Sequence, residues 1–223
     1  MIILAGVSLI TSCSKSDRSL DSGSTQALTQ ERVSRVEGGE FNDSVWTEID
    51  FVHEGVEERL AYADTANFIG QQIYPCARCF LRPEAAQALK LANAKAKLLG
   101  LRLLLFDCYR PKEFQKVMFE IVGDPTYVAE PTKKGSMHNR GLAVDLALAD
   151  AGGEILDFGG EFDDFSAVSH HSYKKLSPLA KENRELLKSI MVEAGFSPYE
   201  YEWWHYSYKS VDYEVDGFVW GCN

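Results

Sequence analysis

Two short segments, residues 136–145 and residues 202–205, contain the side chains of this chain best suited to chemistry. The first supplies His138 and Asp145, and the second supplies Glu202 and His205. Two imidazoles and one carboxylate form a ligand set that suits zinc and leaves a fourth position open for water. Glu202 lies three residues before His205, where it can accept and donate the proton of that water. The combination predicts metal-assisted hydrolysis.

The flanking sequence indicates that these residues converge. His138 precedes Gly141 at the mouth of a predicted strand, whereas Asp145 lies inside that strand. A lone Asp within an apolar strand is costly unless it is paired or bound to a metal. His205 belongs to the last predicted strand, and ligands from adjacent strands can meet at one metal. Each of these residues alone is common in proteins, so the prediction depends on the joint pattern. Imidazole and carboxylate ligands also accept divalent ions other than zinc.

A helix and a buried strand are predicted in the middle of the chain. Residues 83–99 are predicted to be helical, because Pro83 suits a first helical turn and Gly100 suits a stop. Apolar residues recur within this stretch at spacings of three and four. The apolar run 101–106 then predicts a buried strand that ends at Asp107.

A second helix begins at Pro111 and is predicted to place four apolar residues on one face: Phe114, Val117, Met118 and Ile121. A long loop over residues 123–135 follows, and residues 142–148 predict the next strand. Ser177 is a suitable N-cap for a third helix that ends at Gly195. Its predicted inward residues are Leu179, Leu186, Leu187, Ile190, Met191 and Ala194.

The aromatic run 203–208 completes the pattern as a final strand. Helix and strand thus alternate three times, with long irregular connections. We expect an α+β fold with a small, mainly antiparallel sheet packed by helices, and a zinc site between strands.

Length and composition agree with one catalytic domain. The 223 residues are 45% hydrophobic and 12% aromatic, which is enough for a substantial core. The formal net charge is -10 and there is no basic run, so nucleic acid is not expected as a partner. No obligate protein partner is predicted.

The N-terminal residues are predicted to direct export. Residues 1–10 are apolar and too short to span a bilayer comfortably, and Thr11-Ser12-Cys13 follows them. This segment resembles a bacterial lipobox, in which Cys13 becomes the lipidated first residue of the mature protein; the alternative is an ordinary cleaved signal peptide. Residues 14–39 have the composition of a flexible tether, which leaves residues 40–223 as the catalytic domain. Membrane contact is expected through the lipid anchor.

The other four cysteines, at positions 76, 79, 108 and 222, allow three disulfide connectivities. Export makes disulfides permissible. Cys76 and Cys79 have the spacing of half a zinc knuckle, but the sequence has no second closely spaced Cys or Cys/His pair to complete such a site. Disulfides or buried free thiols are therefore expected there, and the sequence leaves the pairing open.

Segments 136–145 and 202–205 together resemble the zinc D-alanyl-D-alanine dipeptidase and carboxypeptidase group of metallopeptidases. The matching residues are Ser136, His138, Gly141, Ala143, Asp145, Glu202, Trp204 and His205. Segments 62–70, 107–111 and 158–171 extend the resemblance, most closely to the dipeptidase branch. The resemblance implies a fold like that of hedgehog and the D,D-peptidases.

The resemblance implies a role for each matching residue. His138, Asp145 and His205 correspond to the ligands of one zinc ion per chain, and Glu202 corresponds to the catalytic base. Arg110 corresponds to an arginine that stabilises the charge developing on the scissile carbonyl. A fixed, permanently charged guanidinium is suited to that role.

Four further residues are implied to lie near the substrate. Asp163 corresponds to a carboxylate that holds the free amino group, although it or Asp164 could instead be a turn residue. Ser136 corresponds to a residue near the substrate carboxylate, and Tyr62 and Tyr74 to tyrosines beside the active site.

The remaining histidines are expected to have no direct chemical role. His53 is expected in an early loop, and His170 and His171 are expected to be structural or to support the site from behind.

The activity implied by the resemblance is hydrolysis of D-alanyl-D-alanine to D-alanine in the bacterial cell envelope, as part of peptidoglycan recycling. One alternative is a D,D- or L,D-carboxypeptidase that trims peptidoglycan stem peptides with the same zinc site. Another is a non-catalytic wall-binding lipoprotein that retains the fold, which the intact ligand set and Glu202 argue against.

Overall fold

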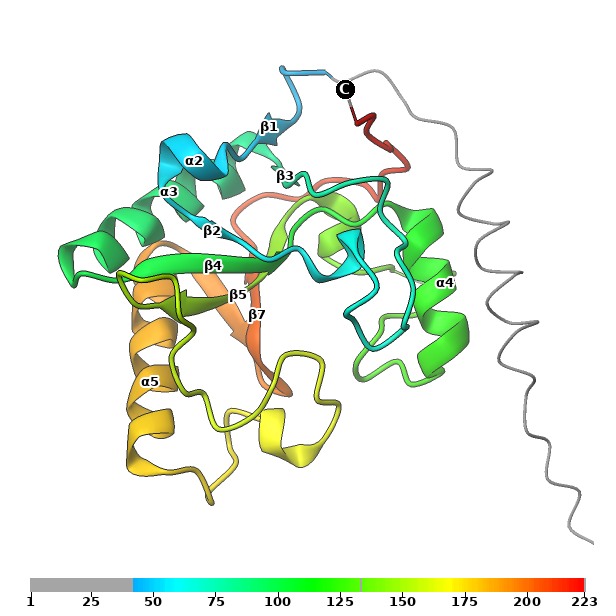
Figure 1. Ribbon diagram of the computed structural model, residues 1–223. Helices are drawn as coiled ribbons and strands as arrows, with labels where there is room; N and C mark the ends of the chain where they lie inside the picture. The colour runs from blue at the N-terminus through cyan, green and yellow to red at the C-terminus, as the bar shows by residue number, and fades with distance from the viewer. Residues whose placement is uncertain (1–41, 133, 223) are drawn as a thin grey trace, which may run out of the picture.

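The computed structural model describes residues 42–132 and 134–222, and a five-stranded sheet forms its centre (Figure 1). The strands lie in the order β2-β4-β5-β7-β6. Their bounds are Glu57–Glu58 for β2, Arg102–Asp107 for β4, Ala143–Ala149 for β5, Phe196–Tyr199 for β6 and Glu202–Tyr208 for β7. β2 runs parallel to β4, whereas the other neighbouring pairs are antiparallel. The predicted α+β class with a small, mainly antiparallel sheet is confirmed.

Three long helices flank the sheet. α3 (Pro83–Leu98) and α5 (Pro178–Glu193) contact each other and the sheet, and α4 (Lys112–Val122) lies on the opposite side of the molecule (Figure 1). The smaller elements are α2 (Phe51–Glu54), the paired strands β1 (Thr47–Glu48) and β3 (Phe80–Leu81), and the 3-10 turns η1 (Ala61–Ala63), η2 (His138–Arg140) and η3 (Ala167–Ser169).

The three predicted helices are present, and each begins at or next to the residue predicted to start it. The Ser177 side chain accepts a hydrogen bond from the backbone N–H of Ala180, as an N-cap should. The prediction that Leu179 points inward is wrong: it is 56% exposed, because the inward face at that turn is formed by Ala180. Ile121, near the end of α4, is likewise 40% exposed. His53 lies in α2 and not in a loop.

Two packed cores surround the sheet. One is mainly aliphatic and lies between the sheet, α3 and α5. The second is rich in aromatic rings, packs beside α4, and includes Trp46, Tyr62, Tyr74, Phe80, Tyr109, Phe114 and Trp220. Closely packed rings leave little free space, so this aromatic core forms a tightly packed wall beside the site.

The four described cysteines form two disulfides, which settles the connectivity that the sequence leaves open. Cys76 pairs with Cys222, and Cys79 pairs with Cys108. The first bond fastens the C-terminal segment to the body of the domain. The second joins Cys79, just before β3, to Cys108, just after β4. The backbone carbonyl of Cys108 is also a hydrogen-bond partner of His138.

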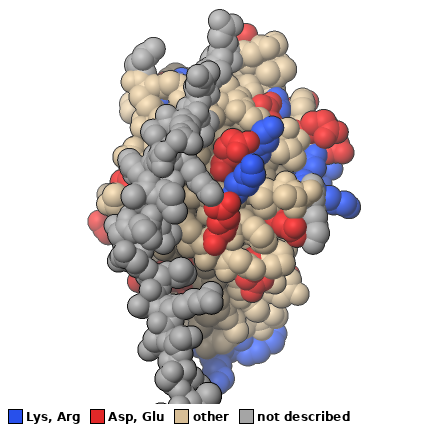
Figure 2. All heavy atoms as spheres, turned by 90° about the vertical axis from the view of Figure 1, so that its right-hand side faces the viewer, with Lys and Arg blue, Asp and Glu red and all other residues tan. Residues whose placement is uncertain are grey.

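The predictions for residues 1–13, for the lipidation of Cys13 and for the tether over 14–39 lie outside the described residues. Within residues 42–132 and 134–222, no helix is both long and apolar enough to cross a membrane. On the face seen in Figure 2, acidic and basic side chains are interspersed among uncharged ones. The negative net charge is therefore not gathered into one acidic patch on that face.

Candidate active site

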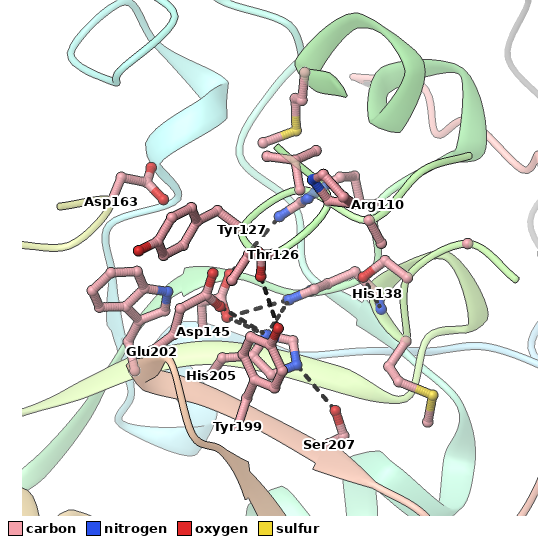
Figure 3. Close-up of a pocket in the computed structure, with 18 of the residues that line it drawn as sticks. Arg110, Thr126, Tyr127, His138, Asp145, Asp163, Tyr199, Glu202, His205 and Ser207 are labelled. Carbon is pink, nitrogen blue, oxygen red and sulfur yellow. Dashed lines mark hydrogen bonds and ion pairs between the residues drawn. The ribbon is translucent and has the colours of Figure 1, made fainter. Parts of the chain in front are cut away.

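Three side chains meet at the centre of the site, in the geometry of a metal-ligand set (Figure 3). His138 Nε2 lies 3.1 Å from His205 Nδ1 and 3.2 Å from Asp145 Oδ1. His205 Nδ1 lies 3.0 Å from Asp145 Oδ1. The structure thus brings together the three predicted ligands, although they come from η2, β5 and β7.

Strand register explains why these residues meet. Asp145 on β5 stands directly opposite His205 on β7, and on its other side opposite Asp107 at the end of β4. Directly opposed residues on neighbouring strands have closely spaced side chains. Three polar residues therefore form one row across three strands of an otherwise apolar sheet.

A bulge at the edge of the sheet lets Glu202 join His205. In a regular strand, residues three positions apart point to opposite faces. Here Pro198 of β6 pairs with Tyr206 while the next residue, Tyr199, pairs with Glu202, so the register shifts and β7 bulges. Glu202 and His205 consequently line the same pocket.

Neighbouring groups fix the orientation of both imidazoles. His138 Nδ1 donates to the carbonyl of Cys108 at 2.6 Å, which leaves the lone pair of Nε2 free to face the pocket. His205 Nε2 lies 3.0 Å from Ser207 Oγ, which leaves Nδ1 facing Asp145. Such outer hydrogen bonds are typical of metal-binding histidines. The residues present therefore fit a divalent metal with imidazole and carboxylate ligands.

Charges within the site keep Asp145 ionised and Glu202 poised to carry a proton. Burial raises the pKa of Asp145, but His138 and His205 outweigh this effect and hold its pKa below the ordinary value. Burial and the charges of Asp145 and Asp163 raise the pKa of Glu202 well above that of a free carboxyl. Glu202 Oε2 lies 3.8 Å from His205 Nδ1, beside the metal-ligand set. A carboxyl with a raised pKa next to a ligand set suits general acid–base chemistry.

Arg110 is clamped by Asp107 at the wall of the pocket. Asp107 Oδ2 accepts hydrogen bonds from Arg110 Nε at 2.9 Å and from Arg110 Nη2 at 2.6 Å. Gln115 Oε1 accepts a third from Arg110 Nη1 at 3.0 Å. Burial lowers the pKa of Arg110, but the charge of Asp107 raises it well above its ordinary value. The guanidinium therefore remains charged, in a fixed position 3.8 Å from Asp145 Oδ2.

Asp163 faces the same pocket from the loop after β5, and it forms no ion pair with any residue that the structure describes. Tyr62 Oη donates to its Oδ2 at 2.9 Å. Burial and the negative charge of Asp145 raise the pKa of Asp163 well above its ordinary value. Asp163 also has a φ of 61°, and among the described residues it is the one non-glycine residue with positive φ. Strained backbone of this kind is often found where a side chain is held for function.

Tyr74 and Ser136 occupy different positions relative to the pocket. Ser136 lines it, as predicted, and its hydroxyl accepts from the backbone N–H of His138 at 3.2 Å. Tyr74 does not line the pocket. It is buried behind Arg110, and its hydroxyl donates to Asp107 Oδ1 at 2.8 Å. Tyr74 is therefore placed to hold Asp107 and not to contact a substrate.

Residues 125–129, in the loop after α4, cover part of the pocket, whose volume is about 240 Å³. Tyr199 Oη donates to the carbonyl of Thr126 at 2.8 Å. The ring of Tyr127 stacks on Phe165 with centroids 5.1 Å apart, which joins this loop to the loop that carries Asp163. Thr126, Tyr127 and Tyr199 stand around the metal-ligand set in Figure 3.

This arrangement can be compared with known proteins. The sequence profile of a peptidase family described as D-ala-D-ala dipeptidase matches residues 44–217. The chain belongs to this family. The match includes every predicted site residue within the described part of the chain, from Tyr62 to His205.

Two relatives in the D-ala-D-ala dipeptidase family show the degree of similarity. A D-alanyl-D-alanine dipeptidase of Escherichia coli strain K12 is 42% identical over 151 residues, covering 68% of this chain and 78% of that protein. One from Enterococcus faecalis strain V583 is 34% identical over 184 residues, covering 74% of this chain and 90% of that protein.

Solved structures of cell-wall peptidases also resemble the chain. The LdcB LD-carboxypeptidase has a TM-score of 0.40 and 26% identity, covering 58% of this chain and 59% of that one. VanYB in complex with D-alanine-D-alanine has a TM-score of 0.39 and 20% identity, covering 58% of this chain and 72% of that one.

Several residues around this site have no role in the sequence-based prediction. Asp107 is the main one, since it holds Arg110 in place. Its position as a lone Asp at the end of an apolar strand is the sequence feature that could have identified it. Gln115 and Ser207 support Arg110 and His205 from behind. Tyr127 joins the covering loop to Phe165, and Tyr199 joins β6 to Thr126 of that loop. Neither tyrosine has a local signal, because their partners are distant in the sequence.

Proposed function

We propose that this protein is a zinc-dependent dipeptidase that hydrolyses D-alanyl-D-alanine to D-alanine. One observation carries the proposal: a single pocket gathers a metal-ligand set, a carboxyl with a raised pKa, a clamped arginine and a carboxylate without a cation. The relatives named D-alanyl-D-alanine dipeptidase support the choice of substrate.

His138 Nε2, His205 Nδ1 and Asp145 Oδ1 would hold the zinc ion. When bound there, zinc supplies Lewis-acid polarisation of the carbonyl and lowers the pKa of water. The protein contributes the ligand orientation, since Cys108 and Ser207 fix the rings of the two histidines.

Glu202 is assigned the proton transfers. Its raised pKa lets the carboxylate accept a proton from the attacking water and then release that proton to the departing amine. This role needs one group to work in both directions near neutral pH, which an ordinary exposed glutamate does poorly.

Arg110 is assigned the charge that develops on the scissile carbonyl oxygen. Addition of water converts the neutral carbonyl into an oxyanion, and a preoriented cation stabilises that state more than the starting state. Because Asp107 holds the guanidinium through two hydrogen bonds, little reorganisation is needed during the reaction.

Asp163 is assigned the free amino group of the dipeptide. An ammonium bound at this carboxylate would supply an ion-pair partner for Asp163, and Tyr62 would hold the carboxylate in place. A longer peptide has no ammonium at this position, so it would leave Asp163 buried and unpaired. This contact favours a dipeptidase over a carboxypeptidase that trims stem peptides.

The catalytic assignment is tested by the Glu202→Gln variant of the full-length, zinc-loaded protein. Release of D-alanine from D-alanyl-D-alanine should fall by about a hundredfold or more, with zinc content unchanged. Glu200→Gln is the matched control, because Glu200 is exposed two positions away and outside the pocket. Equal activity of both variants would refute the assigned role.

The substrate assignment is tested by comparing Asp163→Asn with Asp164→Asn. Asn tolerates the left-handed backbone of position 163, so the fold should persist. Loss of a buried charged partner costs at least about 2 kcal/mol, so kcat/KM for D-alanyl-D-alanine should fall at least about thirtyfold. The Asp164 variant should retain activity. Unchanged kcat/KM in Asp163→Asn would redirect the search to stem peptides.

We also propose that the domain is exported and tethered to the cell envelope through a lipid on Cys13. The apolar run over residues 1–10 and the sequence that follows it support this location. Precursor dipeptide is made in the cytoplasm, so an exported enzyme fits recycling of the dipeptide better than depletion of precursors. A Cys13→Ala variant should leave the membrane fraction; retention there would contradict the anchor.

A further inference from the structure

A second cavity, of about 320 Å³, lies outside the active pocket, between α5 and the segment that precedes it. Its lining residues are His171, Tyr173, Lys174, Leu176, Lys181, Arg184, Glu185 and Lys188. None of them takes part in the proposed peptidase chemistry. Cavities of this size accept small ligands or polar head groups.

The lining is strongly basic, although the chain as a whole carries a net charge of -10. Lys181 and Lys188 lie two helical turns apart on the same side of α5, and Lys174 faces them from the preceding segment. Among the described residues, none of these three lysines forms an ion pair. Glu185 is the acidic residue in the lining. The cavity thus concentrates an excess of positive charge over negative charge.

Arg184 is a buried cation whose charge has no ion-pair partner among the described residues. Arg184 is only 4% exposed to solvent. Nε donates to the carbonyl of Phe158 at 2.7 Å and Nη1 donates to the carbonyl of His170 at 3.2 Å, but Nη2 has no partner. Burial lowers the pKa of Arg184 to about 10, despite the nearby charge of Asp157. A buried charge without a counter-charge is costly.

Three other buried polar atoms around Arg184 have no hydrogen-bond partner within residues 42–132 and 134–222: His171 Nε2, Trp203 Nε1 and Tyr206 Oη. The guanidinium carbon of Arg184 lies 5.8 Å from the centroid of a Trp203 ring, and the rings of His171 and Tyr206 are 6.3 Å apart. Each of these groups can donate a hydrogen bond. Buried water could accept from neutral donors, but it would leave the charge of Arg184 uncompensated.

We infer that this cavity is an anion-binding site for a phosphate-type oxyanion. Lys174, Lys181 and Lys188 would surround the charged group, and Arg184 would provide the buried cation behind it. Oxyanions accept several charge-assisted hydrogen bonds at once, which matches an excess of donors over acceptors. The phosphate could belong to a soluble molecule or to a lipid head group.

The test uses the full-length protein and inorganic phosphate as the probe. Isothermal titration should show one site with a roughly millimolar dissociation constant, and phosphate should raise Tm until saturation. The double variant Lys181→Gln/Lys188→Gln should weaken binding at least about tenfold. The matched control is Lys116→Gln/Lys175→Gln, which makes the same change in net charge outside the cavity. Lysine variants are used because Arg184 variants risk misfolding.

The two double variants decide the result. No phosphate binding by the unmodified protein, or equal weakening in both double variants, would overturn the inference. Sedimentation with phosphatidylglycerol vesicles, compared with titration of glycerol phosphate, would identify the source of the phosphate group. These readouts measure binding and not turnover, so they are independent of the proposed peptidase activity.

Discussion

Asp107 is predicted to control catalysis without contacting the substrate, and Asp107→Asn tests this. Asp107 is fully buried and accepts four hydrogen bonds, from Tyr74 Oη, the backbone N–H of Cys108, and Arg110 Nε and Nη2. Asn can preserve the contacts of Oδ1. It replaces Oδ2 by an NH₂ group, which faces the two Arg110 donors and cannot accept from them.

The magnitude follows from those two lost contacts. Each hydrogen bond to a charged group contributes roughly 1.5–3 kcal/mol, and breaking a buried ion pair costs roughly 3–5 kcal/mol. The free energy of unfolding should therefore fall by about 3–5 kcal/mol. Because Arg110 loses its clamp, kcat should fall by about a hundredfold to a thousandfold, the range for loss of one oxyanion-stabilising donor.

The assays are urea unfolding, zinc content and steady-state release of D-alanine under conditions where the variant is folded. Tyr74→Phe is the matched control, because it removes one hydrogen bond to Asp107 Oδ1 and leaves the Arg110 contacts intact. It should cost about 1 kcal/mol of stability and less than tenfold in kcat. Combining Asp107→Asn with Arg110→Gln should reduce kcat little beyond Arg110→Gln alone. Near-normal kcat in folded Asp107→Asn would refute the reasoning.

Two further predictions concern stability. Gly141→Ala should lower the free energy of unfolding by several kcal/mol more than Gly100→Ala, because both have positive φ but a Cβ at 141 would lie 2.3 Å from a ring atom of Trp46, whereas nothing lies near 100; equal urea midpoints for the two variants would contradict this. Burial and the charge of Lys188 lower the pKa of His171 to about 4 in the folded protein. The unfolded chain therefore binds a proton near pH 6.5 that the folded protein does not bind, so stability should fall as pH drops from about 6.5 to 4, by at most about 1.4 kcal/mol per pH unit. His171→Asn should flatten that part of the pH profile in phosphate-free urea titrations, and an unchanged profile would exclude His171 as its source.

The identity of the chemical groups could be predicted from the sequence because their types and spacing are local. His138, Asp145 and His205 form the predicted ligand set, and Glu202 and Arg110 line the same pocket. The long helices were also predictable, since Pro, Ser and Gly mark helix ends through backbone geometry that does not depend on distant contacts.

The arrangement of those groups was decided by contacts between distant residues. A regular strand would separate Glu202 from His205, and the bulge that unites them requires β6, a strand absent from the sequence-based prediction. The Cys79–Cys108 disulfide and the hydrogen bonds that link Tyr74 through Asp107 to Arg110 likewise join segments far apart in the sequence. Sequence by itself determined which groups could react, because residue type fixes charge and ligand chemistry. Only the tertiary structure decided their orientation and ionisation, because register, burial and neighbouring charge are properties of the folded chain.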